Sequence, residues 1–387
     1  MSVRTFRSSV LSPYERGLEF GRRYPEEIAA CVASYRRLFD RAAGGSVDLD
    51  VVGGQARQQI EACAPNLAAE IEGFATGAGL PPTHLAAINA RTEVLAWAHR
   101  QGGTPPPHEC SAVVKLTVDG TPPVAVQAWD WYADLADSWL VWEIPHADGR
   151  LTTTLTEYGI VGKIGVSSAH LGVLVNILHH ADDGLGIGAP VHVLARKVLD
   201  DAADVNQALL VLTAAPVAAS TALTLVAGSS EANTAVSVEL NPVRAGFALP
   251  DDLGLLIHTN HFLSSPASSA DTELQTGPDT LLRYDLLRRR LHAQTSLSVS
   301  DVVAAMDTHL VGGGSLCCHP DPALAPDAQF QTLATIALDV EAGRMDVTQG
   351  GACTHPLLHP APHTHANDST PTDPTAPTDP GVLAWSR

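Results

Sequence analysis

Cys110 stands where a proline-rich loop, residues 102–108, gives way to a long series of strand-like segments. A cysteine in this position could become a nucleophile if the chain were cut immediately before it. Cleavage of the Glu109–Cys110 peptide bond would leave Cys110 with a free α-amine, whose pKa of roughly 7.7–8.0 is closer to neutrality than the pKa of about 10.4 of a lysine side chain. The amine could then accept the thiol proton, so that one residue would supply both the nucleophile and the general base.

The segments around Cys110 form an ordered set of motifs. They are NARTE at residues 89–93, ECS at 109–111, QAWDW at 127–131, TEYGIVGKIG at 156–165 and HTNHF at 258–262. In that order and spacing they resemble the acyl-coenzyme A:6-aminopenicillanic-acid acyltransferase family of self-cleaving N-terminal-nucleophile enzymes. The resemblance extends from about residue 17 to residue 353. It implies a cut between Glu109 and Cys110 and a catalytic role for the new N-terminal cysteine.

Asp130 lies between Trp129 and Trp131, where the apolar rings would make an unpartnered carboxylate costly. Two interpretations are open. The carboxylate could accept hydrogen bonds from the backbone at the end of a strand, or it could orient the Cys110 amine and handle its proton. The resemblance places the family's catalytic aspartate at this position, which favours the second interpretation.

Asn260 follows an apolar strand, where an asparagine commonly caps a turn. The resemblance implies a different role, because the family's asparagine at this position helps to bind the oxyanion that develops on the substrate. Asn176 is a further candidate for contacts with substrate or backbone.

Four other residues are candidates for supporting or substrate-binding roles. Arg91 and Glu93 lie on an expected helix before the cleavage loop, where they could form an ion pair that stabilises the helix or could support the nucleophile. Tyr158 belongs to the TEYGIVGKIG motif. Ser315 begins the segment SLCCHP, which resembles the family's late loop near the substrate pocket. The resemblance predicts an arginine at about Cys318 in this loop, so one substrate contact differs here.

No metal or organic cofactor is expected. The adjacent Cys317 and Cys318, followed by His319, do not match the usual Cys-x₂₋₄-Cys spacing of about two to four intervening residues in zinc sites. The tail histidines are expected to be solvated; they are His355, His359, His363 and His365. The six cysteines are too few and the chain too long for a disulfide-stapled scaffold, so we expect them to be reduced.

The composition excludes several classes of protein. The chain has 387 residues, of which 45% are hydrophobic, and its mean hydropathy is +0.07, as expected for a globular protein with a large core. The net charge of −19 argues against a nucleic-acid surface. The densest basic cluster, formed by Arg283, Arg288, Arg289 and Arg290, is expected to be the solvated face and end of one helix. Without an apolar span or a signal sequence, the expected location is the cytoplasm and not a membrane.

The pattern of hydrophobic residues divides the chain into three sections. Residues 1–109 are predicted to be helical, with helix starts at Ser12-Pro13 and Pro65 and a helix at residues 83–99. Residues 110–354 are predicted to form the catalytic core, and the Pro/Thr/Asp/His-rich residues 355–387 a disordered tail. Strands are expected at residues 112–118, 124–129, 139–144, 152–156, 171–176, 222–227, 235–240, 253–258, 332–340 and 344–348, and helices at 191–212, 279–292 and 299–310.

Helices followed by two sets of strands indicate an α+β layered domain. The resemblance implies a four-layer αββα sandwich of the N-terminal-nucleophile hydrolase type. The leading functional hypothesis is a self-processing cysteine amidase or acyltransferase that acts on a small-molecule acyl amide or thioester, including acyl-coenzyme A, with its own two cleaved chains as partners. A papain-like thiol hydrolase that uses His258 or His261 would instead keep an intact chain. A catalytically silent homologue that acts as a binding protein is the third alternative.

Overall fold

The computed structural model describes residues 3–103, 110–117, 121–228, 233–265, 267–309 and 315–357. Glu109, the residue expected before the cut, lies outside these ranges, as does the tail from residue 358 onward. None of the helices in the described ranges is long and apolar enough to cross a membrane.

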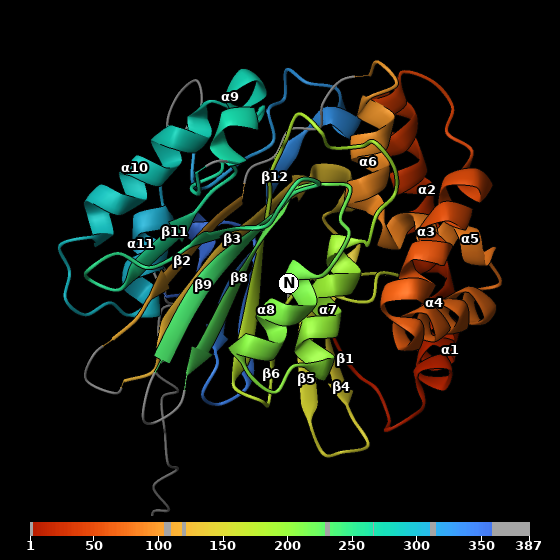
Figure 1. Ribbon diagram of the computed structural model, residues 1–387, viewed down its shortest axis with the longest axis horizontal. Helices are drawn as coiled ribbons and strands as arrows, with labels where there is room; N and C mark the ends of the chain where they lie inside the picture. The colour runs from red at the N-terminus through yellow and green to blue at the C-terminus, as the bar shows by residue number, and fades with distance from the viewer. Residues whose placement is uncertain are drawn as a thin grey trace, which may run out of the picture.

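Two β-sheets form the centre of the molecule (Figure 1). The larger sheet has eight strands in the order β1-β4-β5-β6-β7-β8-β9-β10, antiparallel except for β1 beside β4. Its strands are β1 (Thr5–Arg7), β4 (Trp139–Pro145), β5 (Leu151–Glu157), β6 (Ile164–Ser167), β7 (Leu171–Ile177), β8 (Thr221–Gly228), β9 (Asn233–Leu240) and β10 (Gly246–Ala248).

The smaller sheet has five antiparallel strands in the order β11-β2-β3-β12-β13. Its strands are β2 (Cys110–Lys115), β3 (Val124–Tyr132), β11 (Leu255–His258), β12 (Phe330–Asp339) and β13 (Arg344–Gln349). Every residue of β2 is buried, as is every residue of β3 after the first, because this sheet is covered on both faces. One face packs against the larger sheet through contacts such as those between β2 and β7.

Helices cover the outer faces of both sheets. The helices α7 (Val191–Asp201) and α8 (Val205–Thr213) pack on the larger sheet. The helices α10 (Asp279–Leu291) and α11 (Val299–Met306) pack on the smaller sheet, where Leu287 and Val302 share an apolar cluster with Val113. The short helix α9 (Glu273–Thr276) precedes α10. The four layers confirm the αββα sandwich that the resemblance predicts.

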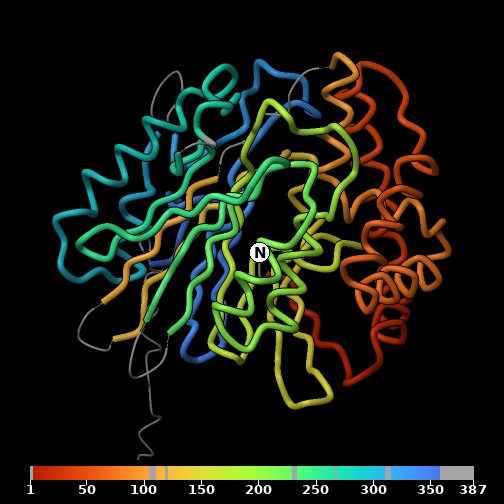
Figure 2. Tube along the Cα trace, viewed as in Figure 1, coloured from red at the N-terminus to blue at the C-terminus, as the bar shows by residue number. Residues whose placement is uncertain are grey.

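Six N-terminal helices group together at one side of the sheets (Figures 1 and 2). Ser12 begins the first of them with a capping box, as expected from its sequence. Gly17 lies so close to the fourth helix that a Cβ there would stand 2.0 Å from the Glu70 carbonyl oxygen, so only glycine permits this helix contact. The helices are α1 (Pro13–Arg23), α2 (Pro25–Ala43), α3 (Leu49–Cys63), α4 (Pro65–Ala78), α5 (Pro82–Asn89) and α6 (Arg91–His99).

Most of the predicted elements agree with the observed ones. The sequence did not indicate α3, nor the short strands β1, β6 and β10, which have only three or four residues each and too little alternation to be recognised. The stretch predicted as one helix over residues 191–212 is two helices, because Asp204 caps the start of α8 by accepting a hydrogen bond from the Gln207 amide. The helix expected over residues 83–99 is likewise divided, at Ala90.

Candidate active site

Cys110 is the first residue of β2 and is buried, with 6% of its surface exposed. The hairpin of β2 and β3 pairs Cys110 with Trp129, which brings the next residue, Asp130, beside the thiol. The Cys110 Sγ lies 3.8 Å from the backbone carbonyl oxygen of Asp130. The pairing of β3 with β12 shifts register at this point, between Thr332 and Ala334. Irregular pairing of this kind often re-aims side chains at functional sites.

Asn260 contacts the backbone of Cys110 directly. The Cys110 amide N–H donates to Asn260 Oδ1 at 3.0 Å, and Asn260 Nδ2 donates to the Ile177 carbonyl oxygen at 2.9 Å. The contact follows from the topology, since β11 pairs with β2 up to His258 opposite Ala112 and Asn260 lies two residues further on. The role that the resemblance implies for Asn260 requires it to lie beside Cys110, as it does, although in this structure its amide nitrogen is bonded to the Ile177 carbonyl.

Arg283 is a component of the site that the sequence did not indicate. Its side chain is fully buried and donates to the Cys110 carbonyl oxygen at 3.2 Å, to Ser111 Oγ at 3.2 Å and to Asn260 Oδ1 at 3.0 Å. An ion pair with Asp279 at 2.9 Å, one turn earlier on α10, orients the guanidinium. The expectation that the whole arginine cluster is solvated is wrong for Arg283, because this residue faces the sheet while Arg289 is exposed.

Asn176 connects the two sheets at Cys110. It is the penultimate residue of β7, and its Nδ2 donates to the carbonyl oxygens of Cys110 at 3.1 Å and of His258 at 3.2 Å. The sequence left open whether Asn176 contacts the substrate or the backbone. In the structure its side chain contacts the backbone. Both the N–H and the carbonyl of Cys110 are thus held by side chains from distant parts of the chain.

Burial suppresses ionisation of the Cys110 thiol. Desolvation, followed by the nearby Asp130 carboxylate, raises the pKa of Cys110 from 9.0 to about 12, while Lys163 and Arg283 act in the opposite direction. A thiol with this pKa is an unreactive nucleophile at neutral pH. The site therefore needs a base beside the thiol, or a local positive charge, before the sulfur can attack.

Lys163 places a buried amine where its charged form lowers the pKa of this thiol. Its Nζ lies 3.8 Å from the centroid of the Trp129 ring and donates to Glu157 Oε2 at 2.5 Å. Burial lowers the pKa of Lys163 from 10.5 to about 7, with Arg91 acting in the same direction and Glu157 against it. Lys163 is the one charged residue between Tyr158 and Ser167 in the sequence, and a lone cation in a buried segment is a signal that could have identified it.

Arg91 forms the second cation of this buried network. Its guanidinium stacks 4.2 Å from the Trp131 ring centroid, and its Nη2 lies 3.5 Å from Glu157 Oε2. Tyr35 donates to the other oxygen of Glu157 at 2.5 Å. Two cations thus share one carboxylate, and the network connects the N-terminal helices to the strands beneath Cys110. This placement supports the interpretation that Arg91 assists the nucleophile.

Glu93 points away from Arg91, as residues two positions apart on a helix do. Its Oε1 accepts a hydrogen bond from the Val191 amide at 2.9 Å, and its Oε2 has no hydrogen-bond partner among the described residues. Burial raises the pKa of Glu93 from 4.5 to about 8. The alternative of a helix-stabilising Arg91–Glu93 ion pair is wrong, since Arg91 pairs with Glu157.

Tyr158 and Ser315 make their contacts elsewhere. Tyr158 accepts a hydrogen bond from Arg4 at 2.6 Å and packs against Tyr24. Ser315 Oγ donates to the carbonyl oxygens of Thr308 and Cys317, and so closes its own loop. The structure therefore does not bring either side chain to Cys110, and it is Glu157, the neighbour of Tyr158, that enters the site.

The two histidines of the alternative thiol-hydrolase hypothesis are engaged with other groups. His258 Nε2 contacts Glu239 Oε1 and its Nδ1 contacts the Thr259 carbonyl oxygen, both at 2.9 Å. His261 Nδ1 lies 3.0 Å from Thr280 Oγ1, and burial followed by His258 and Arg283 lowers the pKa of His261 to about 4. Among the described residues, no hydrogen bond joins either ring to the Cys110 thiol.

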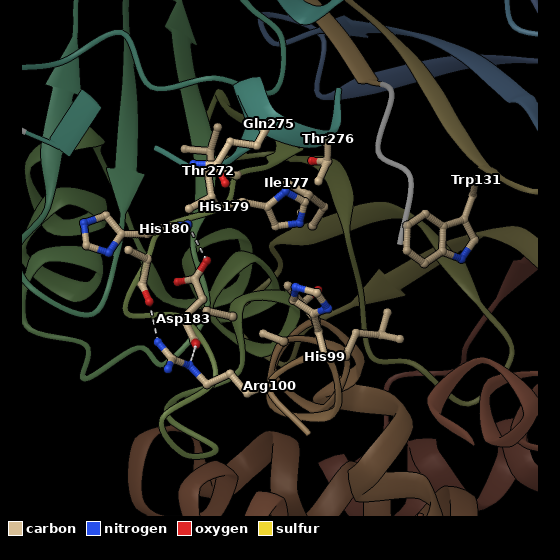
Figure 3. Close-up of a pocket in the computed structure, with 16 residues that line it drawn as sticks. His99, Arg100, Trp131, Ile177, His179, His180, Asp183, Thr272, Gln275 and Thr276 are labelled. Carbon is tan, nitrogen blue, oxygen red and sulfur yellow. Dashed lines mark hydrogen bonds between the residues drawn. The ribbon is translucent and has the colours of Figure 1, made fainter. Parts of the chain in front are cut away.

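A cavity of about 310 Å³ is lined by Trp131 and Ile177, whose preceding residues, Asp130 and Asn176, contact Cys110 (Figure 3). Cys110 itself is not among the lining residues. Leu95 and Leu178 contribute apolar surface. The polar lining residues are Thr92, His99, Arg100, His179, His180, Asp183, Thr272, Gln275 and Thr276. Burial alone would lower the pKa of His179, but a hydrogen bond with Glu273 at 2.5 Å raises it. The cavity therefore offers a small molecule apolar surface together with polar groups of both charges, since Arg100 and Asp183 both line it.

Comparison with known proteins identifies the family. Residues 117–352, more than half of the chain, match the model of the family described as acyl-coenzyme A:6-aminopenicillanic acid acyl-transferase. The 40 kDa form of the acyl-coenzyme A:6-aminopenicillanic-acid-acyltransferase of Emericella nidulans is 26% identical over 283 residues, which cover 72% of this chain and 75% of the relative.

Two solved structures are similar to this chain at lower sequence identity than that relative. They are the Caenorhabditis elegans ortholog of N-acylethanolamine-hydrolyzing acid amidase (12% identity, TM-score 0.43, covering 60% of this chain and 93% of that one) and penicillin V acylase from Agrobacterium tumefaciens (16% identity, TM-score 0.43, covering 62% and 83%). On the family match, the chain belongs to the acyl-coenzyme A:6-aminopenicillanic acid acyl-transferase family of enzymes.

Proposed function

We propose that this protein is a self-processing cysteine amidase or acyltransferase in which Cys110 is first released as an N-terminal residue and then forms a thioester with the substrate's acyl group. The observation that carries the proposal is the convergence of Asn260, Asn176 and Arg283 on the backbone N–H and carbonyl of Cys110. A cysteine with only a structural role has no need of three buried polar side chains around its own peptide groups.

In the processing step the Cys110 sulfur adds to the carbonyl carbon of Glu109, and the Glu109–Cys110 C–N bond breaks as the nitrogen gains a proton. The resulting thioester is hydrolysed by water, which leaves a carboxylate on Glu109 and a free amine and thiol on Cys110. The N-terminal chain would stay bound, because Tyr35 and Arg91 are buried against Glu157 of the core. The two chains produced by the cleavage would therefore be partners of one another.

In the catalytic step the Cys110 amine is the general base. Asn260 Oδ1, which accepts from the Cys110 N–H in the described chain, is positioned to hold the amine, while the Lys163 and Arg283 cations favour the thiolate over the thiol. We assign to Asp130 the proton that the amine receives, because its carboxylate acts electrostatically on Cys110. The Asn260 amide nitrogen can serve the oxyanion if it releases the Ile177 carbonyl oxygen.

The substrate is a small-molecule amide or thioester whose acyl group occupies the cavity beside Trp131. The mostly apolar wall suits a hydrocarbon or aromatic acyl chain, and the thioester formed on Cys110 is passed to water or to an amine. An acyl-coenzyme A thioester is a donor for the transfer branch, in keeping with the printed name of the family.

Trapping of the acyl-enzyme tests this function. The protein should be incubated with activated acyl thioesters and amides, and peptide mass spectrometry should find a single acyl group on Cys110. Cys318→Ser is the matched control, because the Cys318 Sγ donates to the Phe330 carbonyl in a different loop and its loss should leave acylation unchanged. Acylation of any other residue, or turnover retained in Cys110→Ala, would refute the proposal.

A further inference from the structure

Four side chains from three separate segments meet on the smaller sheet's side of the molecule. His309 follows α11, Cys317 and His319 lie in the loop before β12, and Cys353 belongs to the short 3₁₀ turn Ala352–Thr354. Each offers one nitrogen or sulfur atom, and these four atoms all lie within 4.8 Å of one another. None of the four takes part in the chemistry proposed above.

The distances between these atoms are those of a tetrahedral metal site. Zn–S bonds of about 2.3 Å and Zn–N bonds of about 2.0–2.1 Å require about 3.6 Å between a nitrogen and a sulfur ligand and about 3.4 Å between two nitrogen ligands. His319 Nε2 lies 3.6 Å from Cys317 Sγ and 3.5 Å from Cys353 Sγ. It lies 3.0 Å from His309 Nε2. Three edges of the tetrahedron are thus within a few tenths of an ångström of the required lengths.

We propose that His309, Cys317, His319 and Cys353 bind one zinc ion in a closed structural site. Two thiolates and two imidazoles are a ligand set that zinc prefers in tetrahedral geometry, and four protein ligands leave no position for a substrate. A hydrogen bond between the two imidazoles would account for only one of the close distances, whereas a single ion accounts for all of them. The exposed rings of His309 and His319 give an ion a path from solvent.

The surroundings of the four ligands fit this assignment. His309 Nδ1, the ring nitrogen not offered to the ion, lies 3.7 Å from Asp307 Oδ1. This separation is longer than a hydrogen bond but places the carboxylate on the ring nitrogen that commonly carries the outer partner of a metal-bound histidine. Gly351 leaves the room that the Cys317 sulfur needs, since a Cβ at this position would stand 2.4 Å from Cys317 Sγ.

The zinc ion would brace the part of the sheet that carries Asp130. The residue between two ligands, Cys318, exchanges backbone and side-chain hydrogen bonds with Thr332 on β12, at 2.9 and 3.0 Å. Thr332 pairs in register with Asp130 on β3. The metal would therefore fix a loop that is bonded to the strand next to Asp130, without contacting the reacting atoms.

Metal analysis of the full-length, untagged protein tests the proposal. After dialysis against metal-free buffer, the wild-type protein should retain about one zinc ion per chain. Both Cys353→Ser and His319→Gln should lower the affinity for zinc by at least about tenfold, since loss of even the outer partner of a ligand costs about 10- to 100-fold, and should therefore lower the content after dialysis. Cys318→Ser, which removes the adjacent thiol, should keep the full content. Equal zinc in wild type and in both ligand variants would overturn the proposal, because the ion would then be bound elsewhere, such as by the tail histidines.

Two further measurements on the wild-type protein remain informative if the variants fold poorly. Replacement of zinc by cobalt should give the intense visible bands of tetrahedral cobalt together with a thiolate charge-transfer band, and a protein that takes up no cobalt would contradict the proposal. Thiol titration of the denatured, metal-free protein should detect all six cysteines as free thiols. Only four thiols would indicate a Cys317–Cys353 disulfide in place of the metal site.

Discussion

The backbone N–H of Cys110 donates a 3.0 Å hydrogen bond to the side-chain oxygen of Asn260, 150 residues further along the chain. Arg283 donates to the same oxygen at 3.0 Å and also to the Cys110 carbonyl. The peptide nitrogen that the proposed cleavage would turn into an amine is therefore already held, in the uncut chain, by a polar group that can orient the amine afterwards.

Replacement of Asn260 should impair catalysis more than stability. Asn260→Ala removes the acceptor for the Cys110 nitrogen, and loss of one such preorganised polar contact typically costs about 100- to 1000-fold in rate. The rate of acylation by an activated thioester measures the effect. Asn241→Ala is the control, since the Asn241 side chain bonds to its own loop at Val243 and Arg244. A similar rate loss in the control would show that general destabilisation causes the effect.

Replacement of Arg283 should affect both processing and stability. Arg283→Leu leaves the partly buried Asp279 carboxylate without its ion-pair partner and removes one of the two donors to both the Asn260 oxygen and the Cys110 carbonyl. Breaking a buried ion pair commonly costs about 3–5 kcal/mol. Urea unfolding and the rate of chain cleavage measure the two effects. The matched control is Arg289→Leu on the same helix, where an exposed substitution should change stability by less than about 0.5 kcal/mol. Equal effects of the two variants would contradict the assignment of Arg283 to the site.

The sequence predicted the convergence of Cys110 and Asn260 because strand order and motif order carry that information. It did not predict Arg283, since a run of arginines on an amphipathic helix is usually solvated and only the packing of α10 on the sheet shows which one is buried. Glu157 and Lys163 lay within a recognised motif, but their pairing depends on the N-terminal helices that close over them. The cluster at Cys317 was missed because His309 and Cys353 stand outside any local metal-binding spacing.

Glu93 should make the protein less stable as the pH rises. Its folded-state pKa of about 8 lies above the ordinary value of 4.5, so between these values the folded protein holds a proton that the unfolded chain releases. The stabilising contribution is complete below pH 4.5 and is lost as the pH approaches 8. Glu93→Gln should remove this dependence. Compared with the protein that has Glu93, the free energy of unfolding of the variant should be higher at pH 8 than at pH 5 by on the order of 2–4 kcal/mol.

Urea unfolding at the two pH values measures the Glu93 effect. The comparison is best made in a Cys110→Ala background, because an uncut chain unfolds as a single molecule. If the free energy of unfolding changes with pH in the same way in the protein with Glu93 and in the Glu93→Gln variant, the buried carboxyl keeps its ordinary pKa.

The fall in activity on the acidic side of the pH profile, its acid limb, should occur at the pKa of the Cys110 amine. Before perturbation by its surroundings this amine has a pKa of roughly 7.7, whereas an ordinary histidine has a pKa of about 6.5. His261→Asn should leave the limb in place, because the pKa of His261 is already lowered to about 4. The kcat/KM profile for an activated substrate measures both proteins. Loss of the limb on this substitution would assign the base to His261 and not to the amine.

Lys163→Met should move the same limb to higher pH and slow acylation at neutral pH. The substitution keeps much of the volume of the side chain but removes a cation that favours the Cys110 thiolate. Lys197→Met, which breaks a more exposed pair with Asp201, is the control and should leave the profile unchanged. An unshifted profile in Lys163→Met would exclude Lys163 from the activation of the thiol.

Intact-mass analysis with N-terminal sequencing tests the central claim most directly. The wild-type protein should yield two chains, residues 1–109 and residues 110–387, the second beginning with Cys110. Cys110→Ala should remain a single uncut chain without activity, because the attacking sulfur is missing. An active wild-type protein that remains intact, or a Cys110→Ala variant that is cut at the same bond, would contradict self-processing by Cys110.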